Sequence, residues 1–244
     1  MKIKRGIATL CIFSMCLTLC MTTAFAQDIN ENQDYNVFSY YEIAAGLVPG
    51  RSVAPMRGPS NIVCVMRIYS DPGSGIAGSI NKDLGHTFLT FLNTSTANIT
   101  VGRHTVAPNK MVSIGKFGRF KEYDGAFYNA ETNRKERLGW YAIDRSIYME
   151  LTASQLSTVS TYLKNHQAGY LEFGDNCACY AAKAWNSVLS ASDSKYINHF
   201  GLPELVYQDI TDIGYYLVGN GLLKADYELC YYNGTTRVPC NDYA

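Results

Sequence analysis

The chain has 244 residues, 47% of them hydrophobic, and its 21 basic and 21 acidic residues give a formal net charge of zero. Such a balance gives no reason to expect nucleic acid or an anionic membrane surface as a partner. Without its first 26 residues the chain keeps 18 basic and 21 acidic residues, a formal charge of −3, and the conclusion is the same.

Residues 1–26 have the pattern of a secretory signal peptide. Three basic residues stand within the first five positions, residues 7–19 form an uncharged apolar run, and an A-x-A triplet at 24–26 marks a cleavage site. The apolar run is short for a membrane anchor. Lipidation of Cys20 is disfavoured because the residue before it is a large leucine. We therefore expect cleavage after Ala26, a secreted or periplasmic protein, and no membrane span in the mature chain.

The mature chain is expected to have an N-terminal arm and one domain. Residues 27–60 are polar and then rich in proline and glycine, which predicts an arm with little regular structure. A role as a pro-segment over the site stays open. Residues 61–244 have the length of a single domain with a core of its own.

The first half of this domain reads as strands. Residues 61–70 are β-branched and bounded by turn residues, which predicts a strand, and a Gly- and Ser-rich loop follows at 71–85. Residues 86–93 and 99–107 predict two strands joined by a polar turn, and hence a hairpin. Residues 115–139 mix aromatic and charged residues without a clear period, so we expect a long irregular insertion, either functional or simply solvated.

The second half adds helices. Residues 140–151 predict a strand, and residues 152–166 a helix that opens with a Thr152/Gln155 capping box. A short extended segment at 169–173 precedes a helix at about 177–190, and another helix is expected near 203–213. Strands followed by helices predict an α+β domain in which helices pack on an antiparallel sheet.

Five cysteines remain after the signal peptide, and export permits disulfides among them. Cys230 and Cys240 flank an Asn-Gly turn, which predicts a small hairpin closed by its own disulfide. Cys64, Cys177 and Cys179 then compete for one more bond. Cysteines two positions apart bond each other poorly, so Cys64 is expected to take one of that pair.

Cys177 and Cys179 stand at the start of a helix behind Asn176, a capping residue type. The partial positive charge of a helix N-terminus favours a thiolate, and its N–H groups can stabilise an oxyanion. We therefore expect Cys177 to be the nucleophile and Cys179 to be the cysteine bonded to Cys64. The reverse, in which Cys177 is structural, is an equally open interpretation.

A nucleophilic cysteine needs a base, usually histidine. His86 opens an alternating apolar strand directly after a glycine, and a strand holds a side chain in a fixed direction. His104 lies in the next predicted strand. His166 ends a helix, where a positive charge suits the helix dipole, and His199 lies in a loop, so both have structural explanations. His86 is thus the candidate base.

The motif GHTFLTF (85–91), followed about ninety residues later by YLEFGDNCACYAAKAWN (170–186), resembles the circularly permuted papain-like fold. This superfamily includes NlpC-type cell-wall amidases and lecithin–retinol acyltransferase-like proteins. Gly85-His86, Asn176-Cys177 and Tyr180 match its pattern, and the resemblance covers roughly residues 61–190. It implies Cys177 as nucleophile and His86 as base.

The resemblance also implies a third polar residue, from the strand after the histidine, that orients the base. That strand offers Thr100, His104 and Thr105, and His104 has the chemistry for the role, although the strand register decides which way it faces. Without a clear third residue, an inactive relative of the family stays open.

The sequence thus predicts an exported thiol-dependent amidase or peptidase without metal or cofactor, since its His and Cys residues are too scattered for a metal-ligand set. The expected partner is a peptide or amide substrate, with peptidoglycan as one candidate on the analogy of fold and compartment. An acyltransferase or lipid hydrolase would use the same dyad. A catalytically inactive binding domain is the alternative from another class, supported by the 19 tyrosines and the aromatic 115–139 segment.

Overall fold

The computed structural model describes residues 37–51, 61–73, 85–120, 123–139, 144–171 and 174–240. All of them belong to one compact unit, residues 35–244. The predicted signal peptide lies outside the described residues. Among the described helices, none combines the length and the apolar character that a bilayer crossing requires.

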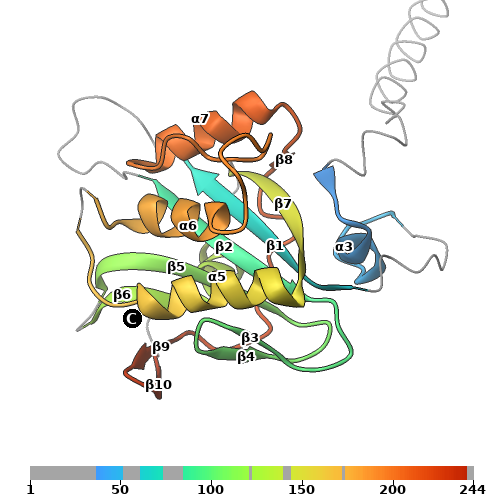
Figure 1. The fold of residues 1–244 in the computed structure, drawn as a ribbon. Helices are drawn as coiled ribbons and strands as arrows, with labels where there is room; N and C mark the ends of the chain where they lie inside the picture. Colours follow the sequence, from blue (N-terminus) through green and yellow to red (C-terminus); the bar gives the residue numbers. More distant parts are fainter. Residues whose placement is uncertain are drawn as a thin grey trace, which may run out of the picture. The chain divides into compact units, whose positions relative to one another are not determined.

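One antiparallel sheet of eight strands forms the centre of the molecule, in the order β10-β9-β6-β5-β2-β1-β7-β8 (Figure 1). Every neighbouring pair is antiparallel, so the predicted α+β class with an antiparallel sheet is confirmed. The strands are β1 (Ile62–Asp71), β2 (His86–Asn93), β5 (Met111–Phe120), β6 (Tyr123–Tyr128), β7 (Arg145–Thr152), β8 (Leu217–Val218), β9 (Cys230–Asn233) and β10 (Thr236–Pro239).

Helices α5 (Ala153–Asn165), α6 (Cys177–Asn186) and α7 (Pro203–Ile213) lie across one face of this sheet (Figure 1). Strand alternation sorts the residues of β1 between the faces. Met66 and Ile68 join the main core beneath the three helices. Arg67 and Tyr69 point to the opposite face, where α3 (Tyr40–Ala44) supplies the partner of Arg67.

Several predicted elements are confirmed. The strand expected at 61–70 is β1, and the helix expected at 203–213 is α7, with Pro203 in its first turn. The helix expected at 152–166 is α5, and its Thr152/Gln155 capping box is formed. The strand expected at 140–151 is described from Arg145, as β7. Helix α6 begins at Cys177 as predicted but ends at Asn186, whose side chain bonds the backbone of Ile197 in both directions.

The predicted hairpin between 86–93 and 99–107 is wrong. Strand β2 pairs instead with β1 and β5, which continue the large sheet. Residues 99–107 fold back on themselves as β3 (Ile99–Val101) and β4 (His104–Val106), a separate two-stranded sheet. Gly102 makes this turn with a φ of +60°, a conformation that glycine adopts without strain.

The interpretation of 115–139 as an irregular insertion is also wrong. It contains most of β5, all of β6 and helix α4 (Ala130–Leu138). The sequence of β5 does not alternate between apolar and polar residues as a half-buried strand usually does. It carries glycines and a buried lysine instead. Many of the charged residues belong to α4, which is buried in its first turn and exposed in its last.

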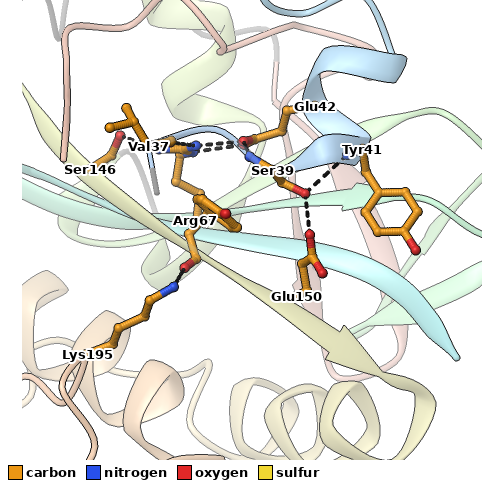
Figure 2. A network of polar contacts seen from close by, with 9 residues as sticks. Val37, Ser39, Tyr41, Glu42, Arg67, Ser146, Glu150 and Lys195 are labelled. Carbon is orange, nitrogen blue, oxygen red and sulfur yellow. Dashed lines mark hydrogen bonds and ion pairs between the residues drawn. The ribbon is translucent and has the colours of Figure 1, made fainter. Parts of the chain in front are cut away.

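The N-terminal arm has more structure than predicted. Ser39 and Glu42 form a capping box that opens α3, and Glu42 is buried. Its carboxylate receives two hydrogen bonds from the guanidinium of Arg67, at 2.9 and 2.6 Å, and the Ser39 hydroxyl donates to Glu150 on β7 (Figure 2). Residues 37–51 are thus part of the folded unit.

The predicted disulfides are absent, since all five cysteines of the mature region are thiols. The 230–240 hairpin forms, as β9 and β10, but Cys230 pairs with Pro239 in its register. Cys240 is one position further, and successive residues of a strand point to opposite faces. Accordingly Cys230 lies in the main core, whereas Cys240 packs on the cluster around Phe127.

The distance along β1 explains why Cys64 does not pair with Cys179. Asp71 is opposite His86 in the register, and Cys64 is seven residues away, or about 23 Å at the usual rise of a strand. Helix α6 begins beside Thr87, so Cys179 lies near the Asp71 end. A disulfide requires Cα atoms within about 7 Å. Cys179 instead donates its thiol hydrogen to the Phe200 carbonyl, at 3.0 Å.

Candidate active site

Cys177 is the first residue of α6 and is almost completely buried. Asn176 caps this helix as predicted: its Oδ1 accepts the Cys179 N–H at 2.9 Å. The Asn176 Nδ2 donates to the Gly201 carbonyl at 2.8 Å. The side chain of Asn176 therefore fixes the start of the helix at Cys177.

His86 is the first residue of β2, and Gly85 determines how the chain enters that strand. Gly85 has a φ of +75°, and a Cβ atom there would overlap the Asp71 carbonyl oxygen. The imidazole stacks on Phe117 with ring centroids 4.4 Å apart and on Phe88 at 5.7 Å. Contacts with these two aromatic rings hold the plane of the imidazole.

The structure brings Cys177 and His86 together as a hydrogen-bonded pair. Burial opposes charge on both groups, but each is the largest favourable influence on the other. The Cys177 thiolate, followed by Glu131, raises the pKa of His86 to about 9. The His86 charge, followed by the N–H groups of Thr87 and Ala178, lowers the pKa of Cys177. Each of the two side chains thus favours the charged form of the other.

Glu131, in the first turn of α4, is the third member of this group. Its Oε1 lies 3.0 Å from His86 Nε2, and its Oε2 accepts a 2.7 Å hydrogen bond from the Ser113 hydroxyl. Because Nε2 faces Glu131, Nδ1 is the nitrogen left for Cys177. Gly115 provides the space, since a Cβ there would overlap Glu131 and lie 2.7 Å from His86 Nε2.

His104, the predicted third residue, is held elsewhere. It lies on β4, buried, with its Nδ1 3.3 Å from the Tyr232 hydroxyl and its ring stacked on Tyr128. Asn93, at the far end of β2 from His86, donates to the Val106 carbonyl of the same strand β4. Strand β2 is eight residues long, which puts His104 about 20 Å from His86. Thr100 and Thr105 pair with each other on β3 and β4.

Two acidic residues lie at the same edge of the sheet as His86, one on the neighbouring strand β1 and one just before β7, the strand beyond it. Asp71 is opposite His86 in the register, and Asp144 stands next to Asp71 just before β7. Burial, followed by Asp71, raises the pKa of Asp144 to about 9, against an opposing effect of His86. Burial and the Asp71 carboxylate thus favour the protonated form of Asp144, whose two carboxyl oxygens are buried without a hydrogen-bond partner among the described residues.

Sequence reasoning missed Glu131 because the segment around it was interpreted as a loop. The available signal is the order of residues at 123–131: an aromatic-rich stretch typical of a strand, then Asn129, then an acidic residue where a helix begins. An acid in a first helical turn is ordinary on its own. What distinguishes Glu131 is its complete burial, which only the fold shows.

This group has the components of a nucleophilic site. It combines a thiol at a helix N-terminus, an imidazole hydrogen-bonded to it and a buried acid that orients the ring, and such an arrangement can transfer acyl groups. Within the described parts of the chain, His, Cys, Asp and Glu form no group of three or more suited to a metal ion. Comparisons with models of protein families, with curated proteins and with solved structures find no match to this chain.

Proposed function

We propose that the protein is a cysteine hydrolase that cleaves an amide or peptide bond through an acyl-enzyme on Cys177. The Cys177–His86–Glu131 constellation carries this proposal. It supplies a nucleophile, a proton donor and an orienting acid from three different elements, α6, β2 and α4. A purely structural cysteine has no need of a buried ion pair.

In the first half of the reaction the Cys177 thiolate attacks the carbonyl carbon and an S–C bond forms. The oxyanion of the tetrahedral intermediate forms at the start of α6, where the positive end of the helix dipole stabilises it. As the C–N bond breaks, the His86 imidazolium gives its proton to the leaving amine. A thioester on Cys177 and a neutral His86 remain.

In the second half His86 is the base. It takes a proton from water, whose oxygen attacks the thioester carbonyl, and the S–C bond then breaks. The products are a carboxylic acid, the Cys177 thiolate and the His86 imidazolium, so the starting state is restored. Glu131 keeps the imidazole in one orientation and stabilises its charge throughout.

The substrate class follows from export and from the suspected fold. A signal peptide cleaved after Ala26 would deliver the protein outside the cytoplasm, where peptides of the cell wall are candidate substrates. The order of His86 on a strand and Cys177 on a later helix agrees with a circularly permuted papain-like arrangement. That arrangement supports an amidase acting on peptidoglycan stems.

A second candidate, hydrolysis or transfer of a lipid acyl group, is favoured by apolar residues around the start of α6. Leu171, 64% exposed, pairs by backbone hydrogen bonds with Asp175. Leu202, 38% exposed, follows Gly201, which accepts the hydrogen bond from Asn176. Exposed leucines on both sides of the nucleophile would suit an apolar acyl chain.

The decisive experiment offers the mature protein two substrate sets and reads the products by mass. One set is purified peptidoglycan with its soluble muropeptides, and the other is a series of fatty acyl esters and amides. We expect new amino and carboxyl ends in the muropeptides, at one type of bond. Cleavage of the acyl series alone would establish the second candidate instead.

Cys179→Ala is the matched control for Cys177→Ala, because the two thiols are on the same helix two residues apart. We expect Cys177→Ala to abolish turnover and Cys179→Ala to preserve it. Wild-type protein that turns over neither set, and whose Cys177 resists iodoacetamide at every pH, would refute the hydrolase proposal. The inactive binding domain would then be the better interpretation.

A further inference from the structure

Lys116 is a buried lysine beneath the start of α6. Its side chain is 0% exposed, its Nζ donates a 2.7 Å hydrogen bond to Asp175 Oδ2, and the ammonium lies 5.4 Å from the centroid of the Tyr180 ring. Taking an ammonium group out of water is costly unless a partner compensates it. Among the ion pairs of the described residues, Lys116 has one acidic partner, Asp175.

Asp175 belongs to the turn that leads into the nucleophile. Its N–H and its carbonyl both pair with Leu171, at 3.3 and 3.1 Å, which closes the backbone just before the helix. Asn176, the cap of α6, comes next, and Cys177 follows. The Asp175 side chain is 44% exposed and so lies at the surface. Its ion pair with the buried Lys116 connects it to strand β5 of the sheet.

Strand β5 therefore serves both members of the catalytic pair. Gly115, on one face of the sheet, leaves the space in which His86 meets Glu131. Lys116, the next residue, points to the opposite face, towards the helices, where it holds Asp175. The register supports these opposite directions. Gly115 pairs with Phe127, which belongs to a separate apolar cluster, and Lys116 pairs with Ala126, which belongs to the main core.

We propose that Lys116 is a positioning residue for Cys177, acting through Asp175. The ion pair fixes Asp175, two residues before Cys177, relative to the strand that also makes room for His86 and Glu131, and so holds the thiol within hydrogen-bond reach of the imidazole. This inference rests on the proposed function, because Cys177 must be the nucleophile for its placement to matter.

The action is geometric. The groups that contribute most to lowering the pKa of Cys177 are His86 and the N–H groups of Thr87 and Ala178. A change at Lys116 should therefore reach Cys177 chiefly through Asp175. Misplacement of a reacting group by about 1 Å can cost as much as 100-fold in rate.

The experiment measures the rate at which iodoacetamide alkylates Cys177 across a pH series, in Lys116→Met, in Asp175→Ala and in the double variant. We expect each single variant to slow alkylation at pH 7 by about tenfold or more and to move the inflection to higher pH, because the thiolate loses its hydrogen bond to His86. The double variant should be no slower than either single variant, because both remove the same connection.

Lys110→Met is the matched control. Lys110 immediately precedes β5 and pairs with Asp226 from a position 45% exposed, so its removal should leave Cys177 unaffected. Wild-type alkylation rates in both single variants would overturn the proposal, as would single effects that multiply in the double variant. If Lys116→Met does not fold, Asp175→Ala, at a partly exposed position, still decides.

Hydrolysis measured beside alkylation separates this inference from the proposed function. A wild-type Cys177 that alkylates rapidly in a protein that hydrolyses no tested substrate would count against the function alone. Hydrolysis by the wild type together with unchanged alkylation in the variants would count against Lys116 alone.

Discussion

Nε2 of His86 and Oε1 of Glu131 lie 3.0 Å apart, and this contact joins the first residue of β2 to the first turn of α4. Glu131 is fully buried, and Ser113 bonds its second oxygen. The contact directs one nitrogen of the imidazole to the carboxylate and leaves the other for Cys177. It also contributes to the raised pKa of His86.

Glu131→Gln should lower activity by about 100-fold, within the range for a positioned acid–base group. The amide keeps the shape of the carboxylate but removes the charge that stabilises the imidazolium. The pKa of His86 should therefore fall, and activity should decline at a lower pH than in the wild type. The measurement is kcat/KM against pH for both proteins.

Glu136→Gln, on the exposed side of the same helix, is the control for that change and should leave kcat/KM within twofold. A Glu131→Gln protein that keeps both the wild-type rate and the wild-type pH profile would show that Glu131 does not orient His86.

The thiolate–imidazolium pair predicts different pH profiles for alkylation and for hydrolysis. Alkylation of Cys177 needs only the thiolate, so its rate should rise at a pH below the ordinary cysteine value of 9.0 and stay high. Hydrolysis also needs the proton on His86, so it should fall as pH passes about 9. Stopped-flow alkylation and steady-state turnover on one preparation would measure both. Alkylation that begins only above pH 9 would contradict the ion pair.

Gly115→Ala should impair catalysis although it adds only a methyl group. A Cβ at this position overlaps Glu131 Oε1 and lies 2.7 Å from His86 Nε2, so the two side chains must separate. We expect kcat to fall by about tenfold or more, since small displacements of catalytic groups are costly. Gly221→Ala is the control, because its added methyl group meets no atom within 4 Å. Equal turnover in Gly115→Ala and Gly221→Ala would show that the space at Gly115 does not determine how His86 meets Glu131.

The parts of the fold that the sequence predicts are those governed by local rules. The capping box at Thr152 and Gln155 starts α5, Pro203 starts α7, and Gly234 opens the two-residue turn of the C-terminal hairpin, one position later than an Asn-Gly turn would have it. Asn176 likewise marks the start of α6 at Cys177. In each case the residues that set the boundary of the element are close in the sequence. The boundary can therefore be predicted without knowledge of the rest of the fold.

The parts that escape prediction depend on contacts between distant residues. The pairing of β2 with β5 rather than with residues 99–107 is decided by the whole sheet, and no local pattern records it. Glu131 becomes part of the site only because α4 packs over β5, with room made by Gly115. The choice of His104 as third residue followed from the wrong hairpin, since a strand register determines which residues approach His86.

Asp144→Asn should stabilise the protein at neutral and mildly alkaline pH. Burial, followed by Asp71, raises the pKa of Asp144 from 3.8 to about 9, so the folded protein holds a proton that the unfolded chain releases. Asp144 thus makes the free energy of unfolding fall as pH rises from about 4 to about 9. Asparagine has nearly the shape of the carboxyl group but no charge to bury, so it avoids this penalty, and we expect a gain of about 1–3 kcal/mol at pH 8.

Urea unfolding of Asp144→Asn and of the wild type across this pH range tests the prediction, because the pH dependence due to His86 is common to both. The difference between the two proteins should grow with pH up to about 9. A variant that is less stable than the wild type at pH 8, or a difference that does not change with pH, would show that Asp144 is ionised in the folded protein.

Glu42→Gln should strongly destabilise the fold, although Glu42 lies in the N-terminal arm and outside the large sheet. Arg67 is 1% exposed and Glu42 2%, and the carboxylate is the acidic partner of this guanidinium (Figure 2). Removing one charge of a buried pair leaves the other uncompensated, at a cost of about 3–5 kcal/mol. Urea unfolding measures the loss directly.

Two further variants decide whether this loss comes from the buried charge. Glu150→Gln changes the partly buried carboxylate that accepts the Ser39 hydroxyl, and it should cost about 1 kcal/mol. The double variant Arg67→Met/Glu42→Met removes both charges and should recover most of the stability, since apolar replacements of buried pairs are often neutral or better. If the double variant is as unstable as Glu42→Gln, the uncompensated charge of Arg67 is not the cause of the loss. If it recovers, the unpaired guanidinium is the cause, and release of the arm that carries Glu42 as a pro-segment would leave Arg67 with the same uncompensated charge.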